Sequence, residues 1–205
     1  MKRVVLLLLA ALMIAPAAEA KRRETPEEIE RKTRHYTGWE WGAEGRFNLI
    51  FCDTSFEKVL NEPLVSSYKA QAKFGGNILL NGGYFINNNW RLGFELGAQI
   101  QYNYTVVPIA VTARYFYGKR KTSLFNFVNA GTNVLFDNGL RFGALAEGGV
   151  GIRLQSPDSK FKYDIMVGYQ ALMINPRSHG GDFVADKVNF KRVNQSVYIG
   201  LGVNF

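Results

Sequence analysis

The chain has 205 residues, a formal net charge of +8 and one cysteine, Cys52. This length suits a single domain, and one cysteine excludes an intramolecular disulfide. A basic excess favours nucleic-acid binding in a cytosolic protein. Because the N-terminus indicates export, attraction to anionic lipid A phosphates is the expected consequence here.

The first 20 residues have the pattern of a cleaved signal peptide. Lys2 and Arg3 precede an apolar run over residues 4–14, and Ala18-Glu19-Ala20 supplies the small residues that flank a cleavage site. As a helix this run rises only about 16 Å, which is too little to cross a hydrocarbon core. We therefore expect cleavage after Ala20 and export. We find no later apolar run long enough for a membrane helix.

Residues 21–37 differ from the rest of the chain and predict a periplasmic N-terminal segment with a short helix. Thr25-Pro26-Glu27-Glu28 has an N-cap residue, a proline at the first helical position and an acidic residue at the third. Glu27–Arg31 and Glu28–Lys32 are favourable i,i+4 pairs. Because this helix has almost no apolar face, we expect it to lie outside the core, as a leader or as a binding arm.

From residue 38 onward, apolar and polar residues alternate, which is the pattern of strands with one apolar and one polar face. In the clearest segment, Leu92 and Phe94 alternate with Arg91 and Glu95. Segments of this kind follow one another to the last residue, and we count about eight of them. The sequence predicts an all-β fold, an eight-stranded antiparallel up-and-down transmembrane β-barrel over residues 38–205.

The connections support this count. Compact polar turns are expected at 87–89, 118–121, 137–139 and 156–159, and long connections at 52–67 and 175–194. If the chain starts in the periplasm, both long connections follow odd strands and lie outside the cell. The segment 124–136 needs a bulge near Phe127 to keep its phase. Residues 183–193 leave the strand number open, because they could extend the last hairpin or add two strands.

A soluble β-sandwich or lipocalin-like barrel also alternates, but two features favour the inside-out arrangement of a membrane barrel. First, aromatic residues fall at the periplasmic ends of the strands on the apolar face, as in an aromatic girdle: Trp39, Tyr84, Trp90, Tyr117, Phe161 and Phe205. Second, the other face is crowded with charges of both signs: Glu40, Glu44, Arg46, Glu95, Arg114, Arg141, Glu147, Arg153, Lys162 and Asp164. Eight strands leave room only for side chains, so we expect a filled interior.

The last strand carries the most specific motif. Tyr198, Gly200, Val203 and Phe205 fit the terminal β-signal of outer-membrane barrels. Through this motif and its alternation, the chain resembles the small outer-membrane β-barrel superfamily, the group of OmpX, OmpW, the OmpA barrel and the short barrels of Bacteroidota. The resemblance implies residence in the cell outer membrane, contact with lipopolysaccharide, folding by the barrel assembly machinery and a monomer.

We find no convincing site for chemistry. Ser178, His179 and Asp182 lie close in sequence, but adjacent Ser and His side chains rarely point at each other. Acidic residues of the first long connection are too scattered for a calcium site. We expect no catalytic residue, metal or cofactor, and a role in envelope structure or in surface interaction through extracellular loops. A narrow channel, a transport route for hydrophobic solutes and a lipid A-modifying enzyme are the alternatives.

Overall fold

The structure is a computed structural model that describes residues 25–58, 65–101, 104–136, 140–155, 158–174 and 189–205. The predicted signal peptide lies outside these residues. Within the chain, residues up to Arg31 and residues from Lys32 onward form two separate units.

The helix α2 (Pro26–Lys32) begins as predicted. The Thr25 hydroxyl accepts a hydrogen bond from the Glu28 amide at 3.3 Å, and the Glu28 carboxylate accepts one from the Thr25 amide at 3.1 Å. This reciprocal pair is a capping box, which satisfies amides that the first helical turn leaves unpaired. In the described part of the chain, no helix is both long and apolar enough to cross a membrane.

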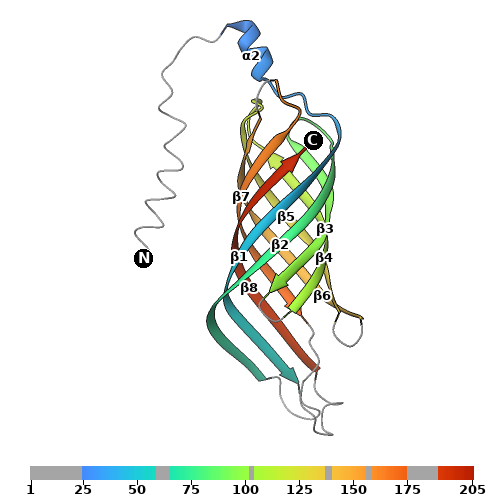
Figure 1. The fold of residues 1–205 in the computed structure, drawn as a ribbon, viewed down its shortest axis with the longest axis vertical. Coiled ribbons are helices and arrows are strands. Elements are labelled where there is room, and N and C mark those ends of the chain that lie inside the picture. The colour runs from blue at the N-terminus through green and yellow to red at the C-terminus, as the bar shows by residue number, and fades with distance from the viewer. Residues whose placement is uncertain (1–24, 59–64, 102–103, 137–139, 156–157, 175–188) are drawn as a thin grey trace, which may run out of the picture. The chain divides into compact units, whose positions relative to one another are not determined.

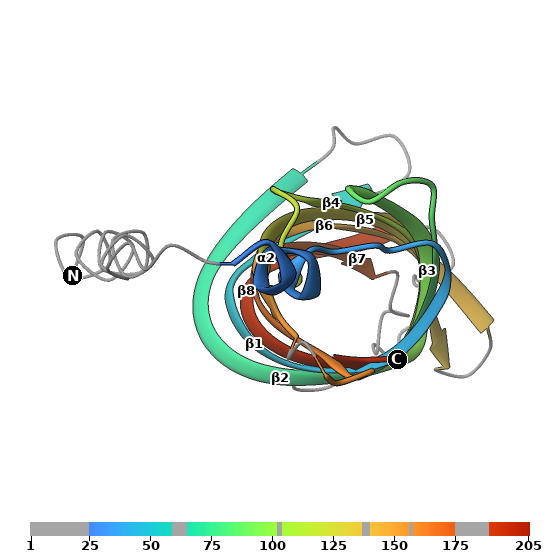
Figure 2. The same ribbon diagram turned by 90° about the horizontal axis from the view of Figure 1, so that it is seen from above.

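Eight antiparallel strands form a closed barrel, as predicted (Figures 1 and 2). They are β1 (Gly38–Lys58), β2 (Val65–Phe85), β3 (Trp90–Gln101), β4 (Tyr104–Phe116), β5 (Ser123–Phe136), β6 (Leu140–Leu154), β7 (Lys162–Ile174) and β8 (Asn189–Asn204). Each strand pairs with its neighbours in sequence, and β8 closes the barrel by pairing with β1. Closure leaves no unpaired sheet edge in the wall, which is what a lipid environment demands.

The barrel has two different ends. At the turn end, β1 begins, β8 ends, and three short connections join β2 to β3, β4 to β5 and β6 to β7. At the opposite loop end lie the connections between β1 and β2 and between β7 and β8. We use these two names below.

The wall of the barrel is inside out, as the alternation predicts. Ile78 is 73% exposed on the outer face and Leu201 is 64% exposed, whereas Arg114 is fully buried on the inner face. In β7 the two faces alternate strictly from residue to residue. Removing one large aliphatic or aromatic side chain from water is favourable by about 1.5–3 kcal/mol of free energy. An outer face covered with such side chains is therefore stable only in apolar surroundings. The chain is built to lie in a lipid bilayer.

One expectation about register was wrong. The pairing of β5 with β4 and β6 continues without a shift, so β5 has no bulge near Phe127. Phe125 and Phe127 point inward, although both are apolar. The directly paired residues explain why they fit: a Cβ atom added to Gly151 would lie 2.5 Å from the Phe125 ring. Glycine on β6 therefore makes room inside the barrel for aromatic rings on β5.

The first long connection is also mostly strand, which corrects the prediction of a loop at 52–67. β1 and β2 continue to pair past a register shift between Ile50 and Cys52, as far as Glu57 and Val65. β8 pairs with β1 as far as Lys58. The shift breaks the two-residue period, which is why the sequence does not show these strands. Three strands thus extend beyond the rest of the barrel at the loop end (Figure 1).

We expect the polarity of the wall to be measurable with single cysteines in a Cys52→Ser background. Phe94→Cys should react with an apolar maleimide in the folded, detergent-bound protein, because Phe94 is exposed, and a brominated detergent should quench the label. Gln99→Cys should react only after heating unfolds the barrel, because Gln99 is fully buried on the same strand. Labelling of Gln99→Cys but not of Phe94→Cys in the folded state would show that the polarity is reversed.

Candidate functional site

The interior of the barrel is filled by side chains in layers. Along β1 from the turn end, the inward residues are first charged, at Glu40, Glu44 and Arg46, then an amide at Asn48 and then apolar at Ile50. β7 likewise begins with charged residues and ends with apolar ones, but Met166 lies between Asp164 and Gln170. An apolar cluster of buried residues completes the layers: Val106, Ala110, Leu135, Leu145, Leu172 and Ile174.

The central layer, which we call the ion cluster, contains equal numbers of acidic and basic side chains. Five carboxylates and five cations belong to it: Glu40, Glu44, Glu95, Glu147 and Asp164 with Arg46, Arg91, Arg114, Arg153 and Lys162. With every group ionised, its formal charge is zero. Five strands, β1, β3, β4, β6 and β7, contribute members, so the cluster ties opposite walls together across the lumen.

Arg46 and Arg114 are the centres of the cluster. The Arg46 guanidinium lies 2.8 Å from Glu44, 2.8 Å from Glu95 and 2.6 Å from Glu147. Arg114 pairs with Glu44 as well, and it lies 3.2 Å from both Glu95 and Asp164. A planar guanidinium has five donors, which lets one residue bind carboxylates from several strands at once.

Glu40 organises the part of the cluster nearest the turn end. Its carboxylate lies 3.0 Å from Arg153, 3.1 Å from Arg91 and 2.6 Å from the ammonium of Lys162. Arg153 binds Asp164 on the neighbouring strand at 2.7 Å. Arg153 therefore links carboxylates that come from β1 and β7.

Amide side chains connect the ion cluster to the rest of the interior. Gln170 donates to Glu147 at 2.6 Å and accepts from Gln99 at 2.7 Å. Asn129 donates to Glu147 at 2.8 Å. Buried charges cost free energy unless they are paired and hydrogen-bonded, and these amides use acceptor sites that the cations leave.

The structure brings nine of the ten predicted interior charges into the cluster. Arg141 is the exception, because it is half-buried near the loop end of β6, six residues before Glu147. Arg91 belongs to the cluster but is missing from the predicted set. Its place in the alternation could have identified it, since it flanks the outward Leu92.

The helix α2 has no buried residue, as expected, but the part of the N-terminal segment that follows it enters the barrel. Arg34 is fully buried and donates to the Ser123 hydroxyl and to the Gly118 carbonyl, both at 2.9 Å. Tyr36 donates from its hydroxyl to Gln155 at 2.6 Å, and its ring lies 4.8 Å from that of Phe85. The sequence does not reveal this insertion, because one Arg and one Tyr in a polar segment show no period.

Aromatic rings and cations close the turn end around Tyr36. Arg153 lies 5.6 Å and Lys162 5.0 Å from the centre of the Tyr36 ring, within the range of cation–π attraction. Burial raises the pKa of Tyr36 to about 12. The phenol therefore stays protonated at any physiological pH, and its hydrogen bond to Gln155 persists.

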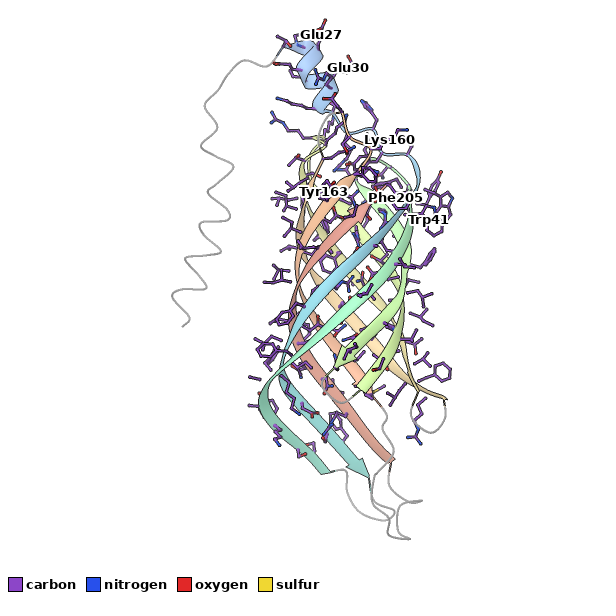
Figure 3. The ribbon with its side chains drawn as sticks, viewed as in Figure 1. Glu27, Glu30, Trp41, Lys160, Tyr163 and Phe205 are labelled. Atoms are coloured by element: carbon purple, nitrogen blue, oxygen red, sulfur yellow. The ribbon has the colours of Figure 1, made fainter. Side chains whose placement is uncertain are left out.

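The predicted girdle residues all lie outward at the turn end: Trp39, Tyr84, Trp90, Tyr117, Phe161 and Phe205 are each exposed. Neighbouring rings contact one another, as between Trp39 and Tyr84 at 5.7 Å. Figure 3 shows Trp41, Tyr163 and Phe205 in the same band.

The residues of the terminal motif lie on both faces of β8. Tyr198 and Gly200 point inward, whereas Val203 and Phe205 are exposed. The Tyr198 ring covers Gly168 of β7, where an added Cβ atom would lie 2.5 Å from the ring. The backbone of Phe205 exchanges hydrogen bonds with Trp41 at 2.9 and 3.2 Å, which continues the closure of the barrel to its last residue.

The arrangement is suited to holding the barrel together. Ser178, His179 and Asp182 lie outside the described residues, and His35 is exposed before β1. Among the described residues, no three His, Cys, Asp or Glu side chains are grouped to hold a metal ion.

Removing the centre of the ion cluster should destabilise the barrel strongly. Arg46→Ala leaves three buried carboxylates without their shared cation, which should cost about 3–5 kcal/mol of unfolding free energy. Arg141→Ala is the matched control, because Arg141 is only half-buried and lies outside the cluster. It should lower the unfolding free energy by less than about 1 kcal/mol. Denaturant titration of the lipid-folded protein, followed by gel migration, measures both. Equal losses would contradict a special role of the cluster.

Comparisons with known proteins agree with the geometry at the level of fold. No protein-family model matches the sequence, and no curated protein sequence matches it. Among solved structures, the outer membrane protein OprG from Pseudomonas aeruginosa is 14% identical over 85% of this chain and 98% of its own, with a TM-score of 0.47. Neisserial surface protein A (NspA) is 15% identical over 82% and 98%, with a TM-score of 0.39.

A third similar structure is Ail, the attachment invasion locus protein of Yersinia pestis, in complex with the heparin analogue sucrose octasulfate. It is 13% identical over 83% of this chain and 100% of its own, with a TM-score of 0.37. Because all three TM-scores are below 0.5, the assignment rests on the strand pairing and on the polarity of the wall. By these two properties, the chain is a small, closed eight-stranded antiparallel β-barrel with an apolar outer face.

Proposed function

We propose that the chain is a non-enzymatic outer-membrane protein that acts in surface interaction, with its loop end outside the cell and its turn end in the periplasm. The orientation follows from the asymmetry of the connections, because outer-membrane barrels have short periplasmic turns and longer extracellular loops. The filled interior supports a role that needs no passage of solute. Transport of ions or of hydrophobic solutes is therefore the weaker candidate.

The observation that carries this proposal is the three-stranded extension of β2, β1 and β8 at the loop end. The pairing of β2 with β3 begins only at Gly75, opposite Gln101. Among the described residues, Val65–Phe74 therefore pair with β1 alone. An edge strand of this kind presents unpaired backbone amides and carbonyls.

The extension has the features of a stable platform. Asp53 and Arg192 form an ion pair at 3.0 Å between β1 and β8, which fixes the outer part of the sheet. Outward side chains on β2 are exposed, and Tyr68 is 70% exposed. Tyrosine supplies a large, rigid contact area and is enriched at protein interfaces. Lys69 on the same strand works against pairing with a second copy of itself.

Shortening the extension should abolish surface interaction without unfolding the barrel. In the variant, residues 54–68 are replaced by an Asn-Gly turn, because Asp53 and Lys69 face each other across the hairpin. Cells that display the wild-type chain should attach to a panel of immobilised extracellular proteins and anionic polysaccharides, whereas the shortened variant should not. Equal attachment of both, or no attachment of either at equal surface levels, would contradict the proposal.

Assembly should depend on the last residue. Phe205→Ala should lower the yield of heat-modifiable protein in the outer membrane and raise its degradation in the periplasm, if Tyr198, Gly200, Val203 and Phe205 act as the β-signal. Phe161→Ala removes another exposed aromatic residue at the same end and is the control. Equal yields of the two variants would show that the terminal motif is coincidental.

A further inference from the structure

We propose that the turn end binds the headgroups of anionic phospholipids through a basic surface that the N-terminal segment and the turn between β4 and β5 build together. This basic rim consists of Lys32, Lys119, Arg120 and Lys121. The inference uses the orientation given under the proposed function, and it is independent of the surface interaction at the loop end.

The rim exists because two basic segments pair through their backbones. Thr33 and Arg120 form an antiparallel bridge. On either side of it, the Lys121 amide donates to the Lys32 carbonyl at 2.8 Å, and the Arg34 amide donates to the Lys119 carbonyl at 2.6 Å. Basic residues that are far apart in sequence are thereby held side by side.

Arg34 fixes this pairing from the inside. Its buried guanidinium bonds to the Gly118 carbonyl, in the same turn, and lies 5.3 Å from the centre of the Phe116 ring. The N-terminal segment is thus anchored exactly where it faces the basic turn, and Lys119 and Arg120 remain exposed.

The other two turns at this end carry no excess of negative charge that could balance the basic rim. The turn between β2 and β3 has no charged residue over 86–89, and in the turn between β6 and β7 Asp158 is balanced by Lys160. Over 25–37 the three glutamates of the N-terminal segment equal its three cations in number. The excess of positive charge at the turn end therefore lies in the turn between β4 and β5, beside Lys32.

The position of the rim identifies the anion. Tyr117 directly precedes the basic turn, is 50% exposed on the outer face and contacts Tyr115 at 5.0 Å; Tyr115 in turn contacts Trp90 at 5.0 Å. Outward Trp and Tyr residues mark the level of lipid headgroups. Cations placed next to them lie at the depth of the lipid phosphates, and clustered Lys and Arg at a membrane surface attract anionic lipids. In the proposed orientation, this surface belongs to the phospholipid leaflet on the periplasmic side.

The test is native mass spectrometry of the full mature chain, folded in a neutral detergent and mixed with phosphatidylglycerol or with phosphatidylcholine of the same acyl chains. The wild-type protein should retain phosphatidylglycerol in preference to phosphatidylcholine. In the variant Lys119→Gln with Arg120→Gln, this preference should fall roughly tenfold. Lys69→Gln with Lys73→Gln removes two charges at the loop end and should leave the preference unchanged.

Three results would overturn the inference. The first is an unchanged preference in the variant of the rim, with heat-modifiable migration showing that it is folded. The second is an equal loss in the loop-end variant, which would indicate a general effect of charge. The third is displacement of the lipid by inorganic phosphate, which would indicate a site for a free anion. None of these results bears on attachment through the extension.

Discussion

A polar side chain inside this barrel has to find its partners inside the barrel, because the outer face of the wall is apolar. The ion cluster satisfies that requirement with equal numbers of carboxylates and cations, drawn from strands that face each other across the lumen. Such a cluster adds little stability relative to an apolar core. If one partner is lost, however, the remaining buried charge is unpaired, and nothing offsets the free energy that its desolvation costs. The interior therefore specifies one register for the whole wall, since a shift of one residue would turn the charges of a strand toward lipid.

The same requirement explains the two places where the chain departs from simple alternation. At the turn end, the wall alone does not fill the interior, and Arg34 and Tyr36 of the N-terminal segment complete it. At the loop end, β1, β2 and β8 extend beyond the rest of the barrel. Their backbones pair with one another there but no longer belong to a closed ring of strands. Both ends thus expose surfaces that the bilayer does not cover, and the two proposals concern these surfaces.

Most of the fold could be predicted from the sequence. The alternation of apolar and polar residues assigns side chains to one face of the wall, and eight alternating segments predict eight strands. Arg46 and Glu95 are predicted to face inward on this basis alone. That Arg46 binds Glu44, Glu95 and Glu147 could not be predicted, since β1, β3 and β6 meet across the lumen only after closure. The expected bulge near Phe127 is absent. Apolar residues occupy both phases of β5, and only the glycines of the paired strand β6 show that Phe125 and Phe127 have room inside the barrel.

Local sequence patterns were sufficient to assign most side chains to a face of the wall, to place the short turns and to predict how the N-terminal helix begins. These features are local, because they depend on residues within a few positions of one another. Tertiary structure alone decided the partners inside the ion cluster, the insertion of the N-terminal segment and the length of the extension. Each of these depends on residues that are distant in sequence and meet only when β8 has paired with β1, and no local period encodes a contact across a closed ring.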